Sequence, residues 1–349
     1  MAKSVVGIDI GARVIRAAEV VERAKQRPVL VRYHEIALPP EAAVRGEVLE
    51  IDTVASALKQ LWSAGGFKSK QVVLGVGSQR VLARDLTVPK MPIVQIRESL
   101  PFQVQDMLPV PVADALLDFY PVSEEVGEGG VMINGLLIAA VKDSVMANVR
   151  AAQAAGLNPL EVDLIPFALS RALLARGDAP ETVAMVHVGA VTTSIVVAKS
   201  GIPQFVRIVP SGGDDVTKTL VSRLKLEVSN ANQVKLAFGL TGENASLEWR
   251  PAVEIIREVA SELLNTVRNT INFFAHTRPR DPISRIVVSG GGTQLAGLQT
   301  ALSEITRLPV SESDPFERFT VDKTVDREAL EASRASVATV LGLTLMGKK

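Results

Sequence analysis

Two short segments, 178 positions apart (9 and 187), share one pattern and constrain the fold more than any other feature of the chain. Residues 6–12 read VGIDIGA, and residues 184–190 read AMVHVGA. Their alignment sets Asp9 against His187 and Gly11 against Gly189, and a β-rich run follows each glycine. A repeated unit of strand, glycine turn and strand predicts two related halves of an α/β fold that face one another.

Glycine turns between paired strands suit the binding of phosphate groups. They present backbone N–H groups, and the missing side chain lets a phosphate approach closely. Two facing turns therefore predict a clamp for a triphosphate. Its residues are Gly11, Ala12 and Arg13 in the first turn and Gly189, Ala190, Val191 and Thr192 in the second. The alternative is a pair of ordinary tight hairpins, which either copy taken alone would favour.

Asp9 stands at the end of the first strand, where burial is expected. A buried carboxylate without a partner is costly. We therefore predict that Asp9 holds a Mg²⁺-bound water beside the phosphates. The alternative is an aspartate that caps its own turn.

Two further glycine motifs precede predicted helices. Gly290, Gly291 and Gly292 follow the strand Ile286–Ser289, a context that suits the approach of adenosine or its α-phosphate to a helix N-terminus. Gly212 and Gly213 precede the predicted helix Asp215–Leu224 in the same way. The alternatives are a flexible strand–helix link for the first motif and simple helix capping by Asp214 or Asp215 for the second.

Lys235 lies in NANQVKLAFG, on a predicted helix that could reach a base or ribose. Without further context it is typical of a solvated surface lysine.

Composition excludes several classes of function. The 38 basic and 38 acidic side chains balance, which argues against a nucleic-acid binder and against a polybasic membrane-surface protein. The chain has no cysteine and only three widely spaced histidines, so a thiolate or histidine metal site is not expected. No signal peptide and no membrane-spanning stretch is recognisable, and we expect a cytoplasmic protein.

Residues 81–156 differ from the flanking sequence in their pattern of predicted strands and helices. Their predicted order of strand, helix, strand, strand and helix fits a small α+β subdomain inserted into a larger fold. The predicted helix Ile93–Met107 contains Pro101, which is expected to kink or break it. We predict three units: a first domain of residues 1–80, 157–180 and 325–349, the insert of residues 81–156, and a second domain of residues 181–324.

In their order along the chain, the motifs at Gly7–Arg13, Val186–Thr192 and Ser289–Thr293 resemble the actin/heat-shock-chaperone/sugar-kinase class. Four longer segments of the sequence are similar to the PilM family of type IV pilus assembly proteins. The segments concerned are VPKMPIVQIRESLPFQVQDMLPVPVADALLDFYPV, LLIAAVKDSVMANVRAAQAAGLNPLEVDLIPFALSRAL, FVRIVPSGGDDVTKTL and GGGTQLAGLQTAL. The resemblance implies an actin-like (ribonuclease H-like, duplicated) two-domain α/β fold, with the insert placed as in FtsA-like proteins. It also implies binding of ATP with Mg²⁺.

The partner that the resemblance implies is a PilN-like bitopic inner-membrane protein. Its cytoplasmic N-terminal peptide would lie in a groove beside the insert, and this chain would be peripheral to the membrane through its partners. Pilus motor or platform proteins are further partners to consider.

The chain departs from the family pattern at positions that matter for catalysis. His187 stands where an acid is usual, and an imidazole is a poor ligand for a hard cation. Ala12 and Arg13 replace small hydroxyl residues, although Arg13 can pair with phosphate oxygens. Asn232 replaces the acid of the family's E-x-x-K, which here ends at Lys235.

The helix after the insert departs as well. It begins Leu164-Ile165-Pro166-Phe167, without a side chain that could orient water or accept a proton. Together these departures predict nucleotide binding with weak or absent hydrolysis.

We therefore expect a nucleotide-responsive scaffold of pilus assembly. The alternatives are an FtsA-like cell-division protein and a small-molecule kinase of the same fold. The kinase would need a catalytic aspartate facing a substrate hydroxyl. FtsA-like proteins typically end in an amphipathic membrane helix, and the end of this chain, ATVLGLTLMGKK, is too short and too little basic to match one.

Overall fold

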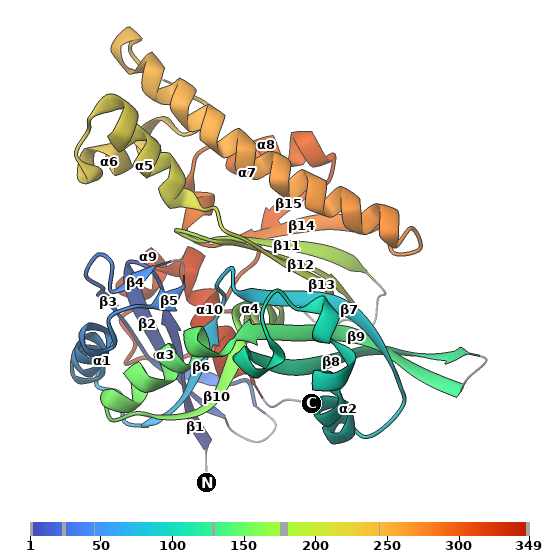
Figure 1. The fold of residues 1–349 in the computed structure, drawn as a ribbon. Coiled ribbons are helices and arrows are strands. Elements are labelled where there is room, and N and C mark those ends of the chain that lie inside the picture. The colour runs from blue at the N-terminus through green and yellow to red at the C-terminus, as the bar shows by residue number, and fades with distance from the viewer. Residues whose placement is uncertain are drawn as a thin grey trace.

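A computed structural model describes residues 3–22, 26–44, 46–127, 130–174, 181–243 and 245–346 of the chain. Two large sheets and one small sheet organise these residues, and helices fill the space between and outside them (Figure 1). Within the part of the chain so described, no helix is both long and apolar enough to cross a membrane.

The first sheet has the strand order β10-β6-β1-β2-β3-β16. Its strands are β1 (Lys3–Ile10), β2 (Val14–Glu22), β3 (Val29–Ala37), β6 (Gln71–Val76), β10 (Asn158–Leu164) and β16 (Thr320–Val321). Side chains alternate between its faces, as a strand's period of two requires. Helices therefore cover both faces.

One face of this sheet is covered by α1 (Ile51–Gly65) and α3 (Lys142–Ala154), and the other by α10 (Arg334–Thr344), α9 (Arg327–Ala332) and α4 (Ile165–Leu173). The helix α1 forms because Val54, Leu58 and Leu61 recur at helical spacing and are fully buried. It ends at Gly66, whose left-handed backbone closes the last turn.

The second sheet repeats this plan in the order β13-β12-β11-β14-β15. Its strands are β11 (Thr182–Val188), β12 (Thr193–Lys199), β13 (Ile202–Val209), β14 (Ile283–Ser289) and β15 (Val310–Glu312). The pairs β1/β2 and β11/β12 are antiparallel, and β1/β6 and β11/β14 are parallel. The predicted duplication is therefore confirmed at the level of topology.

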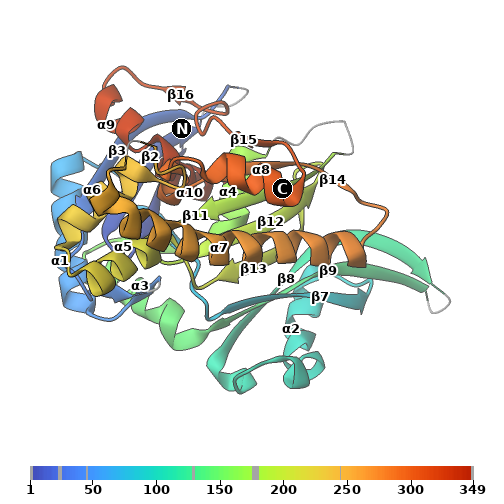
Figure 2. The ribbon, with the colours of Figure 1, turned by 90° about the horizontal axis from the view of Figure 1, so that it is seen from above.

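Four helices cover the outer face of the second sheet: α5 (Gly213–Leu224), α6 (Val228–Phe238), α7 (Arg250–Thr277) and α8 (Leu298–Thr306). The long helix α7 crosses the whole sheet, as Figure 2 shows from above. Its buried side chains form one apolar stripe at helical spacing, which runs from Ile256 through Leu263 and Val267 to Phe274.

The small sheet is the insert, in the order β7-β9-β8. It consists of β7 (Val81–Pro89), β8 (Ala115–Gly127) and β9 (Gly130–Val141), with α2 (Ile93–Gln103) packed on it. The helix α2 continues through Pro101 and ends two residues later, and a 3₁₀ turn, Gln105–Met107, follows. The proline thus lies in the last turn of a helix that is shorter than expected.

Two features bear on the predicted domain division, which remains a prediction. The short strand β16 pairs with β3 of the first sheet, although residues 320–321 were assigned to the second domain. The boundary at residue 180 and the ends at residues 1 and 349 lie outside the described residues. The remaining strands are β4 (Ala43–Val44) and β5 (Glu47–Val48), which form a two-stranded ribbon.

Candidate functional site

The two glycine turns have the same local geometry. The N–H of Gly11 donates to the carbonyl oxygen of Val14 at 3.1 Å, and the N–H of Gly189 donates to that of Thr192 at 2.9 Å. A Cβ atom at either glycine would lie 2.9 Å from the same carbonyl oxygen, closer than real side chains tolerate. Each turn therefore needs its glycine.

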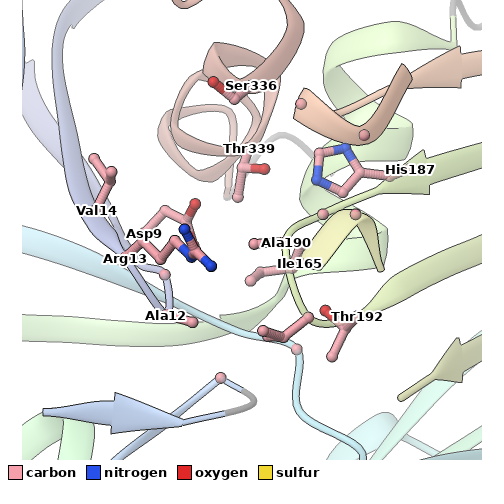
Figure 3. A pocket seen from close by; sticks show the side chains of 18 of the residues that line it. Asp9, Ala12, Arg13, Val14, Ile165, His187, Ala190, Thr192, Ser336 and Thr339 are labelled. Atoms are coloured by element: carbon pink, nitrogen blue, oxygen red, sulfur yellow. The ribbon is translucent and has the colours of Figure 1, made fainter. Parts of the chain in front are cut away.

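A cavity of about 280 Å³ lies between these turns (Figure 3). From the first sheet it is lined by Asp9, Gly11, Ala12 and Arg13. From the second sheet it is lined by Gly189, Ala190, Val191 and Thr192. Four further residues predicted from the sequence also line this cavity: Gly213, Lys235, Gly291 and Gly292.

A second cavity of about 140 Å³ adjoins the first, and the two share Gly213, Lys235, Gly291 and Gly292. Gly212 lines this second cavity only. Most of its other walls are apolar, from Val188, Val216, Leu236, Val259, Leu263, Leu295 and Leu298. A polar cavity thus opens beside an apolar one.

Two predicted residues, Gly290 and Asn232, line neither of these two cavities. Gly290 adopts a φ of 93°, and its N–H donates to the carbonyl oxygen of Ala335 at 2.6 Å. It shapes the glycine loop and ties it to α10. The amide oxygen of Asn232 accepts a hydrogen bond from Thr217 at 2.9 Å, so this side chain positions a neighbour on α5.

Lys235 is more enclosed than its sequence context suggests. Its Nζ donates to the carbonyl oxygen of Gly213 at 3.2 Å and to Oγ1 of Thr217 at 2.9 Å. Burial lowers the pKa of Lys235, the carboxylate of Asp214 opposes this shift, and the guanidinium of Arg13 adds to it. The surface-lysine interpretation fails because α6 turns this face toward α5.

Asp9 and His187 occupy equivalent positions at the ends of β1 and β11 and line opposite walls of the cavity. Burial raises the pKa of Asp9, and the positive charge of Arg16 opposes the rise. Burial also lowers the pKa of His187, to about 4, and Arg16 lowers it further. The imidazole is therefore neutral near pH 7, and its Nδ1 shares a hydrogen bond of 2.9 Å with Oγ of Ser289.

An ion pair crosses the cavity between the two halves. Nε of Arg13, on the first turn, lies 2.7 Å from Oδ2 of Asp214, at the start of α5. Asp214 is buried, whereas the side chain of Arg13 keeps 42% of its surface exposed. The backbone N–H of Asp214 also donates to the carbonyl oxygen of Ala190 at 2.8 Å, so this carboxylate is fixed against the second turn.

Several residues of this wall were not predicted from the sequence. Ser336 and Thr339 of α10 bring two hydroxyl groups to the cavity (Figure 3). Their spacing of three puts them on one face of a helix whose other residues between Ala335 and Leu343 are apolar, and this pattern is visible in the sequence. Ile165, at the start of α4, also lines the cavity, with an aliphatic side chain.

The donor set does not suit a resident Mg²⁺ ion. Among the described residues, no three His, Cys, Asp or Glu side chains converge as metal ligands. Asp9 faces a histidine across the cavity, and the other carboxylate of the lining, Asp214, is paired with Arg13. The assignment of Asp9 to Mg²⁺ stays a prediction, and these residues by themselves do not build such a site.

Comparisons with known proteins agree on the fold and the family. A family model described as type IV pilus assembly protein PilM matches residues 7–348. The cell division protein FtsA of Bacillus subtilis (strain 168) is 20% identical over 321 residues, which are 80% of this chain and 72% of that protein.

Solved structures match over nearly the whole chain. A PilM–PilN type IV pilus biogenesis complex has a TM-score of 0.85 and 26% identity, covering 99% of this chain and 98% of the matched chain. MreB5 of Spiroplasma citri bound to ADP has a TM-score of 0.57 and 12% identity, covering 99% and 96%. The fold is the actin-like α/β fold that the family resemblance implied. Since the family model spans almost every residue, the chain belongs to the PilM family of type IV pilus assembly proteins.

Proposed function

We propose that this chain is a nucleotide-binding scaffold of a type IV pilus or a related machine, and that it binds the cytoplasmic N-terminal peptide of a PilN-like inner-membrane protein. The protein would then work in the cytoplasm, held at the inner membrane through this partner. The choice of partner is supported by the PilM–PilN complex, because the chain shares the fold of the matched protein over almost its full length. Contacts with motor or platform proteins belong to the same proposal.

The observation that carries nucleotide binding is the pair of adjoining cavities. The cavity between the glycine turns is lined by the residues of both turns and by cationic side chains, which suit a polyphosphate. The apolar cavity beside it suits a flat base, and Lys235 lies at the junction of the two. ATP is the nucleotide that we propose.

Hydrolysis is proposed to be slow or absent. Ile165 lines the cavity at the start of α4, where the family resemblance implies a residue that orients water. His187 replaces the expected second carboxylate and is neutral. Binding through the glycine turns depends on neither position, so these two departures support nucleotide binding without fast hydrolysis.

Calorimetry with ATP and with ADP tests the proposal. We expect binding to the wild type together with phosphate release close to the buffer rate. Rapid turnover would contradict the proposed lack of hydrolysis. Phosphorylation of an added sugar or acid would favour the kinase alternative over the scaffold.

Partner binding is tested with a labelled N-terminal peptide of the PilN-like protein encoded with this chain. On the insert, Val94 and Phe102 expose 59% and 81% of their surface along one face of α2, and we propose this region for the test. We expect Phe102→Ser to weaken peptide binding. The matched control is Leu247→Ser in the second half, at a side chain that is 73% exposed. Equal effects of the two substitutions would argue against the insert as the binding region.

A further inference from the structure

Positive charge dominates the cavity between the glycine turns. Arg13, Arg16 and Lys235 line it, against the carboxylates of Asp9 and Asp214. His187 adds no charge near pH 7. Among the lining side chains, three cations thus face two anions. Glu35, outside the lining, pairs with Arg16. An incoming polyphosphate would therefore bring its negative charge chiefly to Arg13 and Lys235.

Each carboxylate of the lining already has a guanidinium beside it. Asp214 is bound to Arg13 at 2.7 Å. Asp9 is directly opposite Arg16 in the antiparallel pairing of β1 with β2. A divalent cation prefers several free oxygen ligands. The two carboxylates of this cavity are less available as ligands because each already neighbours an arginine.

Arg13 is well placed to meet a phosphate group. It lies at the tip of the first turn, and its side chain reaches across the cavity to α5. Within the described residues, Nε is the one nitrogen of its guanidinium that makes a hydrogen bond, so the terminal N–H groups are free for an anion. A guanidinium can bind phosphate oxygens in a bidentate manner.

Arg16 is held in place from outside the cavity. Its Nε donates to Glu35 at 2.9 Å, and Glu35 also accepts from Tyr33 at 2.8 Å and from Ser333 at 3.1 Å. This network fixes the guanidinium in the wall before any ligand arrives. Both arginines are therefore positioned, one by Asp214 and the other by Glu35.

We propose that Arg13 and Arg16 take over the charge-neutralising role of a divalent cation, so that the cavity binds a nucleoside di- or triphosphate without requiring Mg²⁺. The inference rests on the proposed nucleotide binding and adds the identity of the counter-charge. Any Mg²⁺ that enters would come with the phosphates and would be dispensable for affinity.

The test compares binding of a fluorescent ATP analogue and a fluorescent ADP analogue in Mg²⁺ and in excess EDTA. For the wild type we expect the Kd to change by less than about threefold on chelation. Arg13→Ala is expected to weaken binding in EDTA by about 10- to 100-fold, the loss of a charge-assisted contact. Arg13→Lys keeps the positive charge but loses the bidentate geometry of the guanidinium. Its Kd in EDTA is therefore expected to lie between those of the wild type and Arg13→Ala.

The reverse substitution, His187→Asp, adds the second carboxylate and is expected to make binding depend on Mg²⁺. Arg97→Ala removes an exposed arginine of the insert that pairs with Asp118, and serves as the control with unchanged affinity. Circular dichroism checks that each variant is folded. If Arg13→Ala fails to fold, the comparison of wild type and His187→Asp still decides the proposal.

The outcomes separate this inference from the proposed function. Binding of the wild type only in Mg²⁺, or full affinity of Arg13→Ala in EDTA, overturns the inference and leaves the nucleotide-binding scaffold intact. No binding under either condition overturns the proposed nucleotide function and this inference with it.

Discussion

At the scale of single residues, the clearest consequence concerns His187. Burial lowers its pKa from 6.5 to about 4, and Arg16 contributes to the shift. As the pH falls through 6.5, the unfolded chain protonates this residue, whereas the folded chain keeps it neutral down to about pH 4. The contribution of His187 to the stability of the folded state is therefore fully present above pH 6.5 and is lost as the pH falls through this window.

The stability that His187 loses between pH 6.5 and pH 4 can be estimated from its pKa shift. One pKa unit corresponds to about 1.4 kcal/mol, so the contribution of His187 reaches at most about 3 kcal/mol near pH 4. We expect the unfolding free energy of His187→Gln, measured with denaturant, to fall less than that of the wild type between pH 6.5 and pH 4. The control is His276→Gln, at the exposed end of α7. Parallel curves for wild type and His187→Gln would show that the imidazole is not withdrawn from water as described.

At the scale of elements, the loop between β14 and α8 depends on the backbone of one glycine. Gly290 has a φ of 93°, and a Cβ atom there would overlap the carbonyl group of Val188. Its N–H also anchors the loop to α10 through Ala335. The neighbouring Gly291 has open space around the position of a Cβ atom. Adjacent glycines thus have different roles.

We expect Gly290→Ala to lower the unfolding free energy by about 2 kcal/mol or more, because an alanine with a φ of 93° and a ψ of 154° costs about 1–3 kcal/mol before the overlap is added. Gly291→Ala should stay within about 0.5 kcal/mol of the wild type. Thermal and denaturant unfolding of the two variants measure the difference. Equal stabilities would contradict the strained geometry of the loop.

At the scale of the whole molecule, α4 connects the cavity to the insert. Ile165 lines the cavity, and two residues later the ring of Phe167 packs on that of Tyr120 in β8, with 4.6 Å between centroids. The same apolar cluster includes Val206 of β13 and Leu136 of β9. The insert therefore touches the second half and α4 together, and a change in the cleft has a packed route to it.

This arrangement predicts coupling between nucleotide and partner. We expect saturating ATP to change the Kd of the PilN-like peptide by about 5- to 150-fold, and the peptide to change the affinity for ATP by the same factor. Phe167→Leu should reduce the coupling while each ligand still binds alone. Phe273→Leu, at a side chain of α7 that is 56% exposed, is the control. Coupling is measured by titrating each ligand, ATP or the peptide, in the presence and in the absence of the other. Affinities that do not depend on the other ligand would rule the coupling out.

Local sequence patterns determined much of the architecture. The two glycine turns, the duplicated strands and the stripe of α7 depend on backbone conformation and on the period of apolar residues, which short segments encode directly. The same holds for most residues of the cavity wall, because glycines that follow strands are placed by the strands themselves. Such features are predictable one segment at a time.

Tertiary structure alone decided the contacts between distant segments. The pairing of Arg13 with Asp214 joins residues 201 positions apart, and Lys235 turns inward because α6 packs against α5. The hydroxyls of Ser336 and Thr339 reach the cavity because α10 lies against β1 and the glycine loop. The sequence by itself therefore determined that two glycine turns exist and face one another. Which charged side chains meet between them depended on long-range packing, since the geometry of a side chain across a cleft is set by both walls at once.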